Sequence, residues 1–306
     1  MLRQLFKRFL LTLPALWLVL TLVFLMIHIV PGDPVEQMLG EGAAPAAAAQ
    51  LRHSLGLDQP LGKQYGHYLF GLVRGDLGQS FKFQAPVRQI IVERYPATLQ
   101  LAFLALVVCA AIAIPAGVLA AHRRGQTPDR LVGVFTLFGL AIPNFALGPL
   151  LILLLSIEIG VLPVSGRNGI GSYVLPAATL GAALAAILTR MVRGAMLEEL
   201  SADYIRTARA KGLSTAAVLF RHGLRNALIP IITILGLQFG TLLAGTIVTE
   251  TIFSWPGIGR LTVQAISARD YPLLQGCILV ISLSYVLVNL LTDAIYSVVD
   301  PRVRMS

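Results

Sequence analysis

The residues best suited to contact a charged partner lie in one polar segment, DYIRTARAKGLSTAAVLFRHGLRNALIP, which spans residues 203–230. Arg206 and Arg209 are three positions apart, so a helix places both guanidinium groups on one face. Lys211 adds a third cation close by. These groups can bind carboxylates or phosphates, and none of them sits in an arrangement typical of catalysis. The segment therefore predicts a docking element, either for a protein groove or for anionic lipid headgroups.

Helix start and stop signals divide this segment. Ser201 is expected to cap a helix over residues 203–211, and Gly212 is expected to end that helix in a left-handed conformation. Ser214 is expected to cap a second helix that runs on toward the next apolar stretch. The expected apolar face of the first helix comprises Tyr204, Ile205 and Ala208. The pattern predicts a folded pair of short helices rather than an open loop.

Other chemistry has no support in the sequence. Gly62-Lys63 lacks the earlier glycine and the following Ser or Thr of a phosphate-binding loop. The five histidines are scattered, and Ser165 lies outside any nucleophile-elbow pattern. Cys109 and Cys277 lie within apolar runs, which favours packing over a disulfide or a metal site. We therefore predict a chain that is not an enzyme and that binds no cofactor itself.

The composition indicates a membrane protein. Hydrophobic residues make up 56% of the 306 residues and charged residues only 13%, with a mean hydropathy of +0.76. Soluble domains carry about a quarter charged residues. The net charge of +9 does not point to nucleic acid, because the basic residues flank the apolar segments.

Six segments are long and apolar enough to cross a bilayer as helices, since about 20 residues span the hydrocarbon. They are residues 9–30, 97–121, 131–157, 173–192, 229–250 and 273–293. The first resembles a signal peptide, but its apolar run continues to Val30 without a small-residue cleavage site, so we expect it to be retained.

The distribution of Arg and Lys predicts the orientation. These residues concentrate in the N-terminal tail, in the loop after the second crossing, around the loop after the fourth, and in the C-terminal tail. The short loops on the other side carry only Arg167, Arg260 and Arg269. The positive-inside rule therefore places both termini and residues 203–230 in the cytoplasm.

The chain divides into two parts. Residues 1–96 hold the first crossing and a long external segment, and residues 97–306 hold the other five crossings. In the external segment, Asp33 is expected to cap a helix, and the apolar spacing over Leu61–Phe81 predicts a helix on the outer surface.

The middles of the six crossings contain no Asp, Glu, Lys or Arg, whereas ion-coupled transporters usually keep a charged group there. We infer that a partner supplies the energy. Close helix packing is expected at Gly236, Gly240 and the Gly181–Ala186 region, and kinks are expected at the prolines of the second, third and fourth crossings. The residues that either line a pathway or form interhelical hydrogen bonds are Asn144, Gln238 and Asn289.

The polar segment resembles the cytoplasmic coupling loop of ABC importer permeases. The family pattern is Glu-Ala-Ala, three residues, then Gly; aligned on Gly212, this chain has Arg206-Thr207-Ala208, so Ala208 and Gly212 match and the initial Glu does not. DYIRTARAKG with RHGLRNALIP is similar to the peptide/nickel branch. IVPGDPVEQMLG, LGLDQPL, GDLGQSF, ETIFSWPGIGR, RDYPLLQG and DPRVR resemble the same branch in order along the chain.

The resemblance implies an all-α integral membrane protein with the type I importer permease fold, in the bacterial cytoplasmic (inner) membrane. It also implies a homologous second permease, two cytoplasmic ATPases that bind MgATP, and an extracytoplasmic solute-binding protein. The implied substrates are short peptides, with glutathione or nickel as alternatives; an ATP-independent channel or secondary transporter is the alternative of a different class. The residues that would contact the ATPase are Tyr204, Arg206, Thr207, Ala208, Arg209, Lys211, Gly212, Leu213 and Ser214.

The external loop Thr251–Arg260 combines aromatic residues with Gly and Pro. An exposed aromatic side chain on such a loop is a good docking element. We therefore expect Phe253, Trp255 and Pro256 to meet the binding protein, with an interfacial anchoring role for Trp255 as the alternative.

Overall fold

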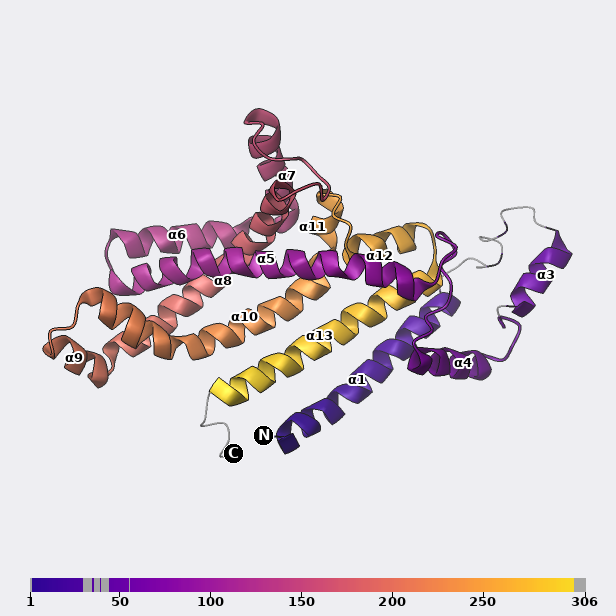
Figure 1. Cartoon of the computed structure of the whole chain (residues 1–306), viewed down its shortest axis with the longest axis horizontal. Helices are drawn as coiled ribbons and strands as arrows, with labels where there is room; N and C mark the ends of the chain where they lie inside the picture. The colour runs from indigo at the N-terminus through magenta and orange to yellow at the C-terminus, as the bar shows by residue number, and fades with distance from the viewer. Residues whose placement is uncertain (1, 30–34, 36–38, 40–43, 55, 300–306) are drawn as a thin grey trace.

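The computed structural model describes residues 2–29, 35, 39, 44–54 and 56–299, and its long elements are all helices (Figure 1). The four longest are α5 (Val87–His122), α8 (Gly171–Ser201), α13 (Tyr271–Val299) and α1 (Leu2–Ile29). Together with α10 (Arg225–Gly245) they run side by side along an elongated bundle. The shorter elements are α3 (Pro45–Ser54), α4 (Leu61–Arg74), α6 (Thr127–Ala141), α7 (Asn144–Leu151), η1 (Ile152–Glu158), α9 (Asp203–Ala210), η2 (Ala217–Leu224), α11 (Ile247–Ile252) and α12 (Ile258–Ser267).

The predicted second, fourth, fifth and sixth crossings correspond to continuous helical spans. They are Val87–His122, Gly171–Ser201, Ala217–Leu243 and Tyr271–Thr292. The second begins ten residues before the predicted boundary, and both it and the fourth continue as single helices through Pro115 and Pro176. In α1 the apolar stretch Leu10–Leu25 is shorter than a full span, so the first crossing, and with it the total of six, stays a prediction.

The predicted third crossing is broken rather than kinked. Helix α6 ends at Ala141, α7 starts at Asn144, and the two directions differ by 102°. Proline disfavours a helical conformation in the residue before it, and Ile142 is extended accordingly, with φ −88° and ψ 113°. The second half, α7 with η1, projects away from the bundle in Figure 1.

Part of the expected external helix forms. Helix α4 covers Leu61–Arg74 and ends at Gly75, whose φ of +75° is left-handed, so the prediction of a helix up to Phe81 is wrong over its last turns. Gly75 can take this conformation without a Cβ penalty, and the chain leaves the helix there. The capping role predicted for Asp33 lies outside the described residues.

Small residues let the helices approach closely, as predicted for the fourth and fifth crossings. A Cβ on Gly181 of α8 would lie 2.7 Å from the carbonyl oxygen of Ala105 in α5. In α10, Gly236 packs directly against Thr292 of α13, and Gly240 faces Tyr285. Close backbone contact replaces the hydrophobic driving force that helices lack in lipid.

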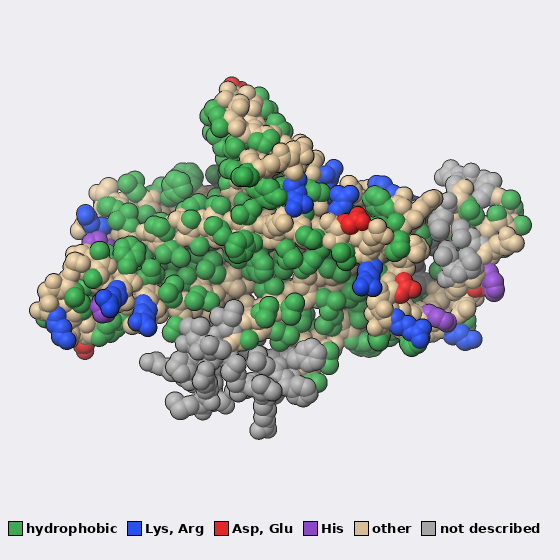
Figure 2. All heavy atoms as spheres, in the orientation of Figure 1, with side chains coloured by type: hydrophobic (Ala, Val, Ile, Leu, Met, Phe, Trp, Pro, Cys, Tyr) green, Lys and Arg blue, Asp and Glu red, His purple; other side chains and the backbone are tan. Residues whose placement is uncertain are grey.

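The outer surface fits a lipid environment. Figure 2 shows hydrophobic side chains over the middle of this face and most Lys and Arg toward its two ends. Exposed apolar residues of α6 and α7 include Phe135, Phe138 and Phe145. Helices α1 and α13 pack together, and the ends that carry the chain termini both point away from α4 (Figure 1). This agrees with termini on one side of the membrane; the cytoplasmic assignment stays a prediction.

Candidate functional site

Helix α9 is a folded element docked on the end of the bundle. Ile205 and Ala208 are buried and form a small apolar cluster with Val218 of η2, against which Leu200 of α8 also packs. The helix is therefore held from two sides, by α8 before it and by η2 after it. A displacement of α9 would therefore move α8 and, through η2, α10.

The predicted cap at Ser201 is wrong. Ser201 is the last residue of α8, and its hydroxyl donates to the Glu198 carbonyl at 2.7 Å. Ala202, extended with ψ 149°, separates the two helices, and no side chain caps α9. Because Ser201 keeps a helical conformation, its hydroxyl turns back into α8 and away from the first N–H groups of α9.

The turn after α9 forms as predicted. Gly212 has a φ of +77°, and its N–H donates to the Arg209 carbonyl at 3.0 Å. The next N–H, of Leu213, reaches the Ala208 carbonyl at 3.3 Å. Ser214 then accepts a hydrogen bond from the N–H of Ala217 at 3.3 Å, so the predicted second cap is confirmed. Helix η2 continues without a break into α10.

Tyr204 was predicted to share the apolar face of Ile205 and Ala208, and this prediction is wrong. Its side chain is 38% exposed, whereas Ile205 is buried. Its hydroxyl donates to the Glu199 carboxylate and accepts a hydrogen bond from Asn226 Nδ2 at 3.0 Å. Partial burial, and then Glu199, raise the pKa of Tyr204, so the phenol stays protonated near neutral pH. Tyr204 thus ties α8, α9 and α10 together.

Glu199 and Asn226 were missed by the sequence reasoning. Glu199 is five residues before Tyr204, whereas Asn226 is 22 residues after it, and no local pattern links the three. Only the fold back of η2 onto α9 brings Asn226 to the phenol.

The outward side of α9 offers a basic edge. Arg206, Thr207, Arg209 and Lys211 are all exposed. Within the described part of the chain, Arg206 pairs only with the exposed Asp203, at 3.4 Å. Exposed pairs of this kind contribute little, so the guanidinium is available to a partner. Leu213 is also exposed beside these groups. Cations next to an apolar side chain suit an acidic, partly apolar groove or a phosphate-rich surface.

The external loop does not present its aromatic side chains. Trp255 is 0% exposed: its indole N–H donates to the Ala97 carbonyl at 2.9 Å, and its ring meets Tyr173 edge-on at 4.7 Å. Phe253 is equally buried, against Gly148 of α7. The predicted exposure of both residues is wrong, because the loop packs its aromatic side chains against residues of α5, α7 and α8. Trp255 does not reach a lipid interface either, and Pro256 stays partly exposed.

A buried carboxylate fixes this loop. Glu250 accepts hydrogen bonds from the hydroxyls of Thr98, at 2.7 Å, and Thr246, at 3.0 Å, and from the N–H of Arg260, at 2.9 Å. Gly257 packs directly on the carboxylate, where any side chain would collide. The sequence reasoning did not single out Glu250, although an acidic residue just before a glycine-containing loop is a signal for this kind of arrangement.

The three pathway candidates come from three different helices. Gln238 of α10 is buried. Its amide nitrogen donates to the Leu184 carbonyl at 3.3 Å, and its amide oxygen accepts a hydrogen bond from the Cys109 thiol at 3.5 Å. These contacts favour the alternative, interhelical hydrogen bonding. Asn144 and Asn289 each keep a buried side-chain oxygen without a partner in the described part of the chain. Their pathway role stays a prediction.

A metal centre is not apparent among the described residues, where no three His, Cys, Asp or Glu side chains gather. The candidate site consists of helix α9, the turn that ends it, and the helices on which both pack.

Comparison with known proteins covers almost the whole chain. Residues 113–305 match the family described as binding-protein-dependent transport system inner membrane component, and residues 1–102 match the corresponding N-terminal family. The chain is 45% identical over 304 residues to the glutathione transport system permease proteins GsiC of Escherichia coli K12 and of Shigella dysenteriae, covering 99% of each chain.

A solved structure shares the fold. The inward-facing MetNI methionine ABC transporter aligns with a TM-score of 0.57 at 20% identity, over 69% of this chain and 97% of that one. The chain belongs to the binding-protein-dependent transport system inner membrane components, and it is a multi-pass permease of the peptide/nickel type in the inner membrane.

Proposed function

We propose that this chain is the membrane-spanning subunit of an ATP-driven importer for short peptides, with α9 as the coupling element. The observation that carries the proposal is the double anchoring of α9: Ile205 and Ala208 pack on η2 and α8, and Tyr204 bonds to both Glu199 and Asn226. A short helix fixed in this way moves as a rigid body with the long helices rather than bending on its own.

The partner at α9 is an ATPase subunit with an acidic groove. Arg206, Arg209 and Lys211 would pair with its carboxylates, while Leu213 fills an apolar position. Two such subunits bind and hydrolyse MgATP beneath this chain and a homologous second permease, and their closure moves the paired coupling helices together. Contact of the same cations with lipid phosphate is the alternative for the basic edge.

The substrate class rests on relatives. A glutathione permease 45% identical over nearly the full length supports a small peptide-like solute, delivered by an extracytoplasmic binding protein. Dipeptides and oligopeptides are the first choice, and glutathione, itself a tripeptide, is the nearest alternative; nickel is the third.

Reconstitution tests the proposal. The chain with its second permease, both ATPases and binding protein, in liposomes, is expected to accumulate a labelled dipeptide only when MgATP is supplied. The same liposomes without the ATPases should show no uptake. Flux by this chain alone would overturn the importer mechanism in favour of a channel or secondary transporter.

A matched pair of variants tests the coupling site. Arg209→Glu reverses one charge on the basic edge of α9, whereas Arg74→Glu reverses one on α4 at the other end of the bundle. We expect Arg209→Glu to weaken ATPase association and uptake together and Arg74→Glu to leave ATPase association unchanged. Equal association for both variants would assign the basic edge to lipid instead.

A further inference from the structure

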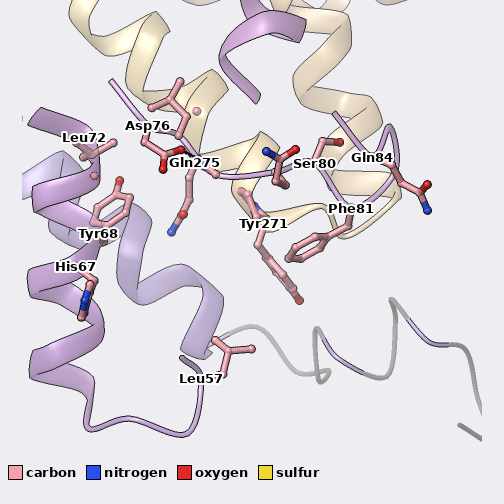
Figure 3. A pocket seen from close by; sticks show the side chains of 16 residues that line it. Leu57, His67, Tyr68, Leu72, Asp76, Ser80, Phe81, Gln84, Tyr271 and Gln275 are labelled. Atoms are coloured by element: carbon pink, nitrogen blue, oxygen red, sulfur yellow. Dashed lines mark hydrogen bonds between the residues drawn. The ribbon is translucent and has the colours of Figure 1, made fainter. Parts of the chain in front are cut away.

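A pocket of about 850 Å³ lies at the end of the bundle opposite α9. Its walls come from α4, from the segment that follows it, residues 76–84, and from the first turns of α13 (Figure 3). This volume lies in the range of small-molecule sites and exceeds what a dipeptide or tripeptide needs. Its residues play no part in the coupling site.

Two tyrosine hydroxyls in this pocket have no hydrogen-bond partner among the residues that the structure describes. Tyr271 is only 3% exposed, and its buried hydroxyl makes no hydrogen bond within the described part of the chain. The hydroxyl of Tyr68, from α4, is in the same situation. Buried polar groups are almost always paired, because an unpaired one loses its hydration without compensation. Two such groups in one pocket point to a ligand that supplies the missing partners.

The state of these hydroxyls defines what they can bind. Burial raises the pKa of Tyr68 to about 12, so its phenol remains neutral and can both donate and accept. Such groups match the N–H and C=O groups of a peptide backbone.

The other lining residues favour a ligand that carries a positive charge. Asp76 holds the N–H of Gly78 at 2.9 Å with one carboxylate oxygen, and its other oxygen makes no hydrogen bond within the described residues. Gln275 donates its amide to the Val23 carbonyl at 3.1 Å, which leaves its side-chain oxygen as an acceptor. The lining includes no Lys or Arg. A carboxylate and neutral acceptors favour an ammonium group, and His67 is the lining side chain that could offer a phosphate a positive charge.

The pocket has two different regions. Figure 3 shows Tyr68, Asp76 and Gln275 in one part, and Phe81 beside Tyr271 in another. A ligand with a cationic head, a polar backbone and a carbon-rich side chain would use both regions.

We propose that this pocket binds a short peptide through its free amino terminus. The ammonium group pairs with Asp76, the first peptide groups bond to the hydroxyls of Tyr68 and Tyr271, and a side chain packs on Phe81. The choice of a peptide over other amines rests on the proposed function. The pocket thus gives the permease its own peptide site, separate from the binding protein.

The test uses the complete transporter in phosphatidylcholine nanodiscs, without ATP and without the binding protein, and measures the binding of alanyl-phenylalanine by equilibrium dialysis. Tyr271→Phe and Tyr68→Phe remove only the hydroxyls. Each is expected to weaken binding roughly three- to tenfold, the value of one hydrogen bond. Tyr285→Phe, which changes an exposed tyrosine of the same helix, is the matched control and should bind as the unchanged protein does.

Stability separates ligand binding from a structural role. Removing an unpaired buried hydroxyl should leave the thermal midpoint of the free transporter unchanged or slightly higher. A lower midpoint, or affinity unchanged by both tyrosine substitutions, would overturn the proposal.

Charge is tested separately. Asp76→Asn keeps the oxygen that holds Gly78 and removes the charge, so it should weaken binding of the free dipeptide roughly tenfold or more. N-acetyl-alanyl-phenylalanine should bind the unchanged protein as weakly. Equal binding of the acetylated and free peptides would contradict an ammonium site.

Lipid is the competing source of an ammonium group. Repeating the measurement in phosphatidylethanolamine nanodiscs should give the same affinity, and loss of peptide binding there would reassign the pocket to the lipid headgroup and overturn the proposal. Uptake with ATP and the binding protein is measured on the same preparations. Intact uptake without peptide binding at the pocket would refute only the pocket, whereas absent uptake would refute the importer function.

Discussion

Gly212 is needed for its backbone conformation alone. Its φ is +77°, and a Cβ placed on it would meet no atom within 4 Å. A β-branched side chain in this conformation costs about 1–3 kcal/mol, whereas Asn tolerates it. We expect Gly212→Val to shift the end of α9 and to reduce ATP-driven uptake several-fold while ATP hydrolysis continues. Gly212→Asn should retain most uptake.

The control for this pair is Gly194, a helical glycine of α8 that also has open space around it. Gly194→Ala should leave uptake and hydrolysis unchanged, since Ala favours the helix. Normal coupling in Gly212→Val would rule out α9 as the coupling element.

Replacing Trp255 by alanine would not be a clean test of docking to a binding protein, because the side chain is part of the core. Its indole is fully buried and bonded to Ala97, so Trp255→Ala removes core packing and is expected to destabilise the protein by about 3–5 kcal/mol. Trp255→Phe should lower the thermal midpoint in detergent by less. Pro256→Ala, on the partly exposed part of the loop, should leave the midpoint unchanged. If Trp255→Phe and Pro256→Ala have the same midpoint, the packing role of the indole is wrong.

Local and non-local information explain which site features could be predicted. Gly212 and Ser214 were identified correctly because a left-handed stop and a serine cap depend on only a few neighbouring residues. The burial of Trp255 could not be predicted, because it depends on Ala97, 158 positions away in sequence. An aromatic residue on a Gly/Pro loop has the same sequence pattern whether it points out or folds in.

The helices as whole elements show the same contrast between features encoded locally and features set by distant contacts. Apolar length predicted four continuous spans, because span length is set by the bilayer and is encoded within each helix. The 102° break at Pro143 was predicted only as a kink. Proline determines where a helix stops, but the direction in which α7 leaves is determined by its packing on α11 and α8, which the sequence alone does not specify.

An ion pair fixes the start of α6 to α8. Arg193 donates two hydrogen bonds to the carboxylate of Asp129, at 2.6 and 2.8 Å, and the N–H of Gly125 donates a third at 2.9 Å. A bidentate pair of this kind is stronger than an ordinary surface pair, although Arg193 is partly exposed and screened. We expect a coupling energy of about 1 kcal/mol between the two side chains.

A double-mutant cycle measures this coupling. Asp129→Asn and Arg193→Gln should each lower the thermal midpoint, and the double substitution should cost less than the sum of the two. Additive effects would show that the pair contributes nothing to holding α6 in place.

At the scale of the molecule, the candidate coupling site and the pocket occupy opposite ends of one bundle. Helix α8 has 31 residues and is about 46 Å long, and the span Ala217–Leu243 continues directly from the turn after α9. Both long helices are joined to α9, and both pack on α5 through close contacts. Motion imposed at α9 would therefore be carried as displacement of packed helices along the bundle.

This arrangement requires the two ends to lie on opposite sides of the membrane, which accessible cysteines can test. Cys109 and Cys277 are fully buried, so the unchanged protein should not react with a membrane-impermeant maleimide. Lys211→Cys, exposed beside α9, should react only in inside-out vesicles, and adding the ATPase subunits should protect it. Ile170→Cys, at a site 90% exposed in the loop before α8, should react only in intact spheroplasts and should not be protected. Reaction of both from the same side would reverse the predicted topology, and with it the assignment of α9 to the cytoplasm.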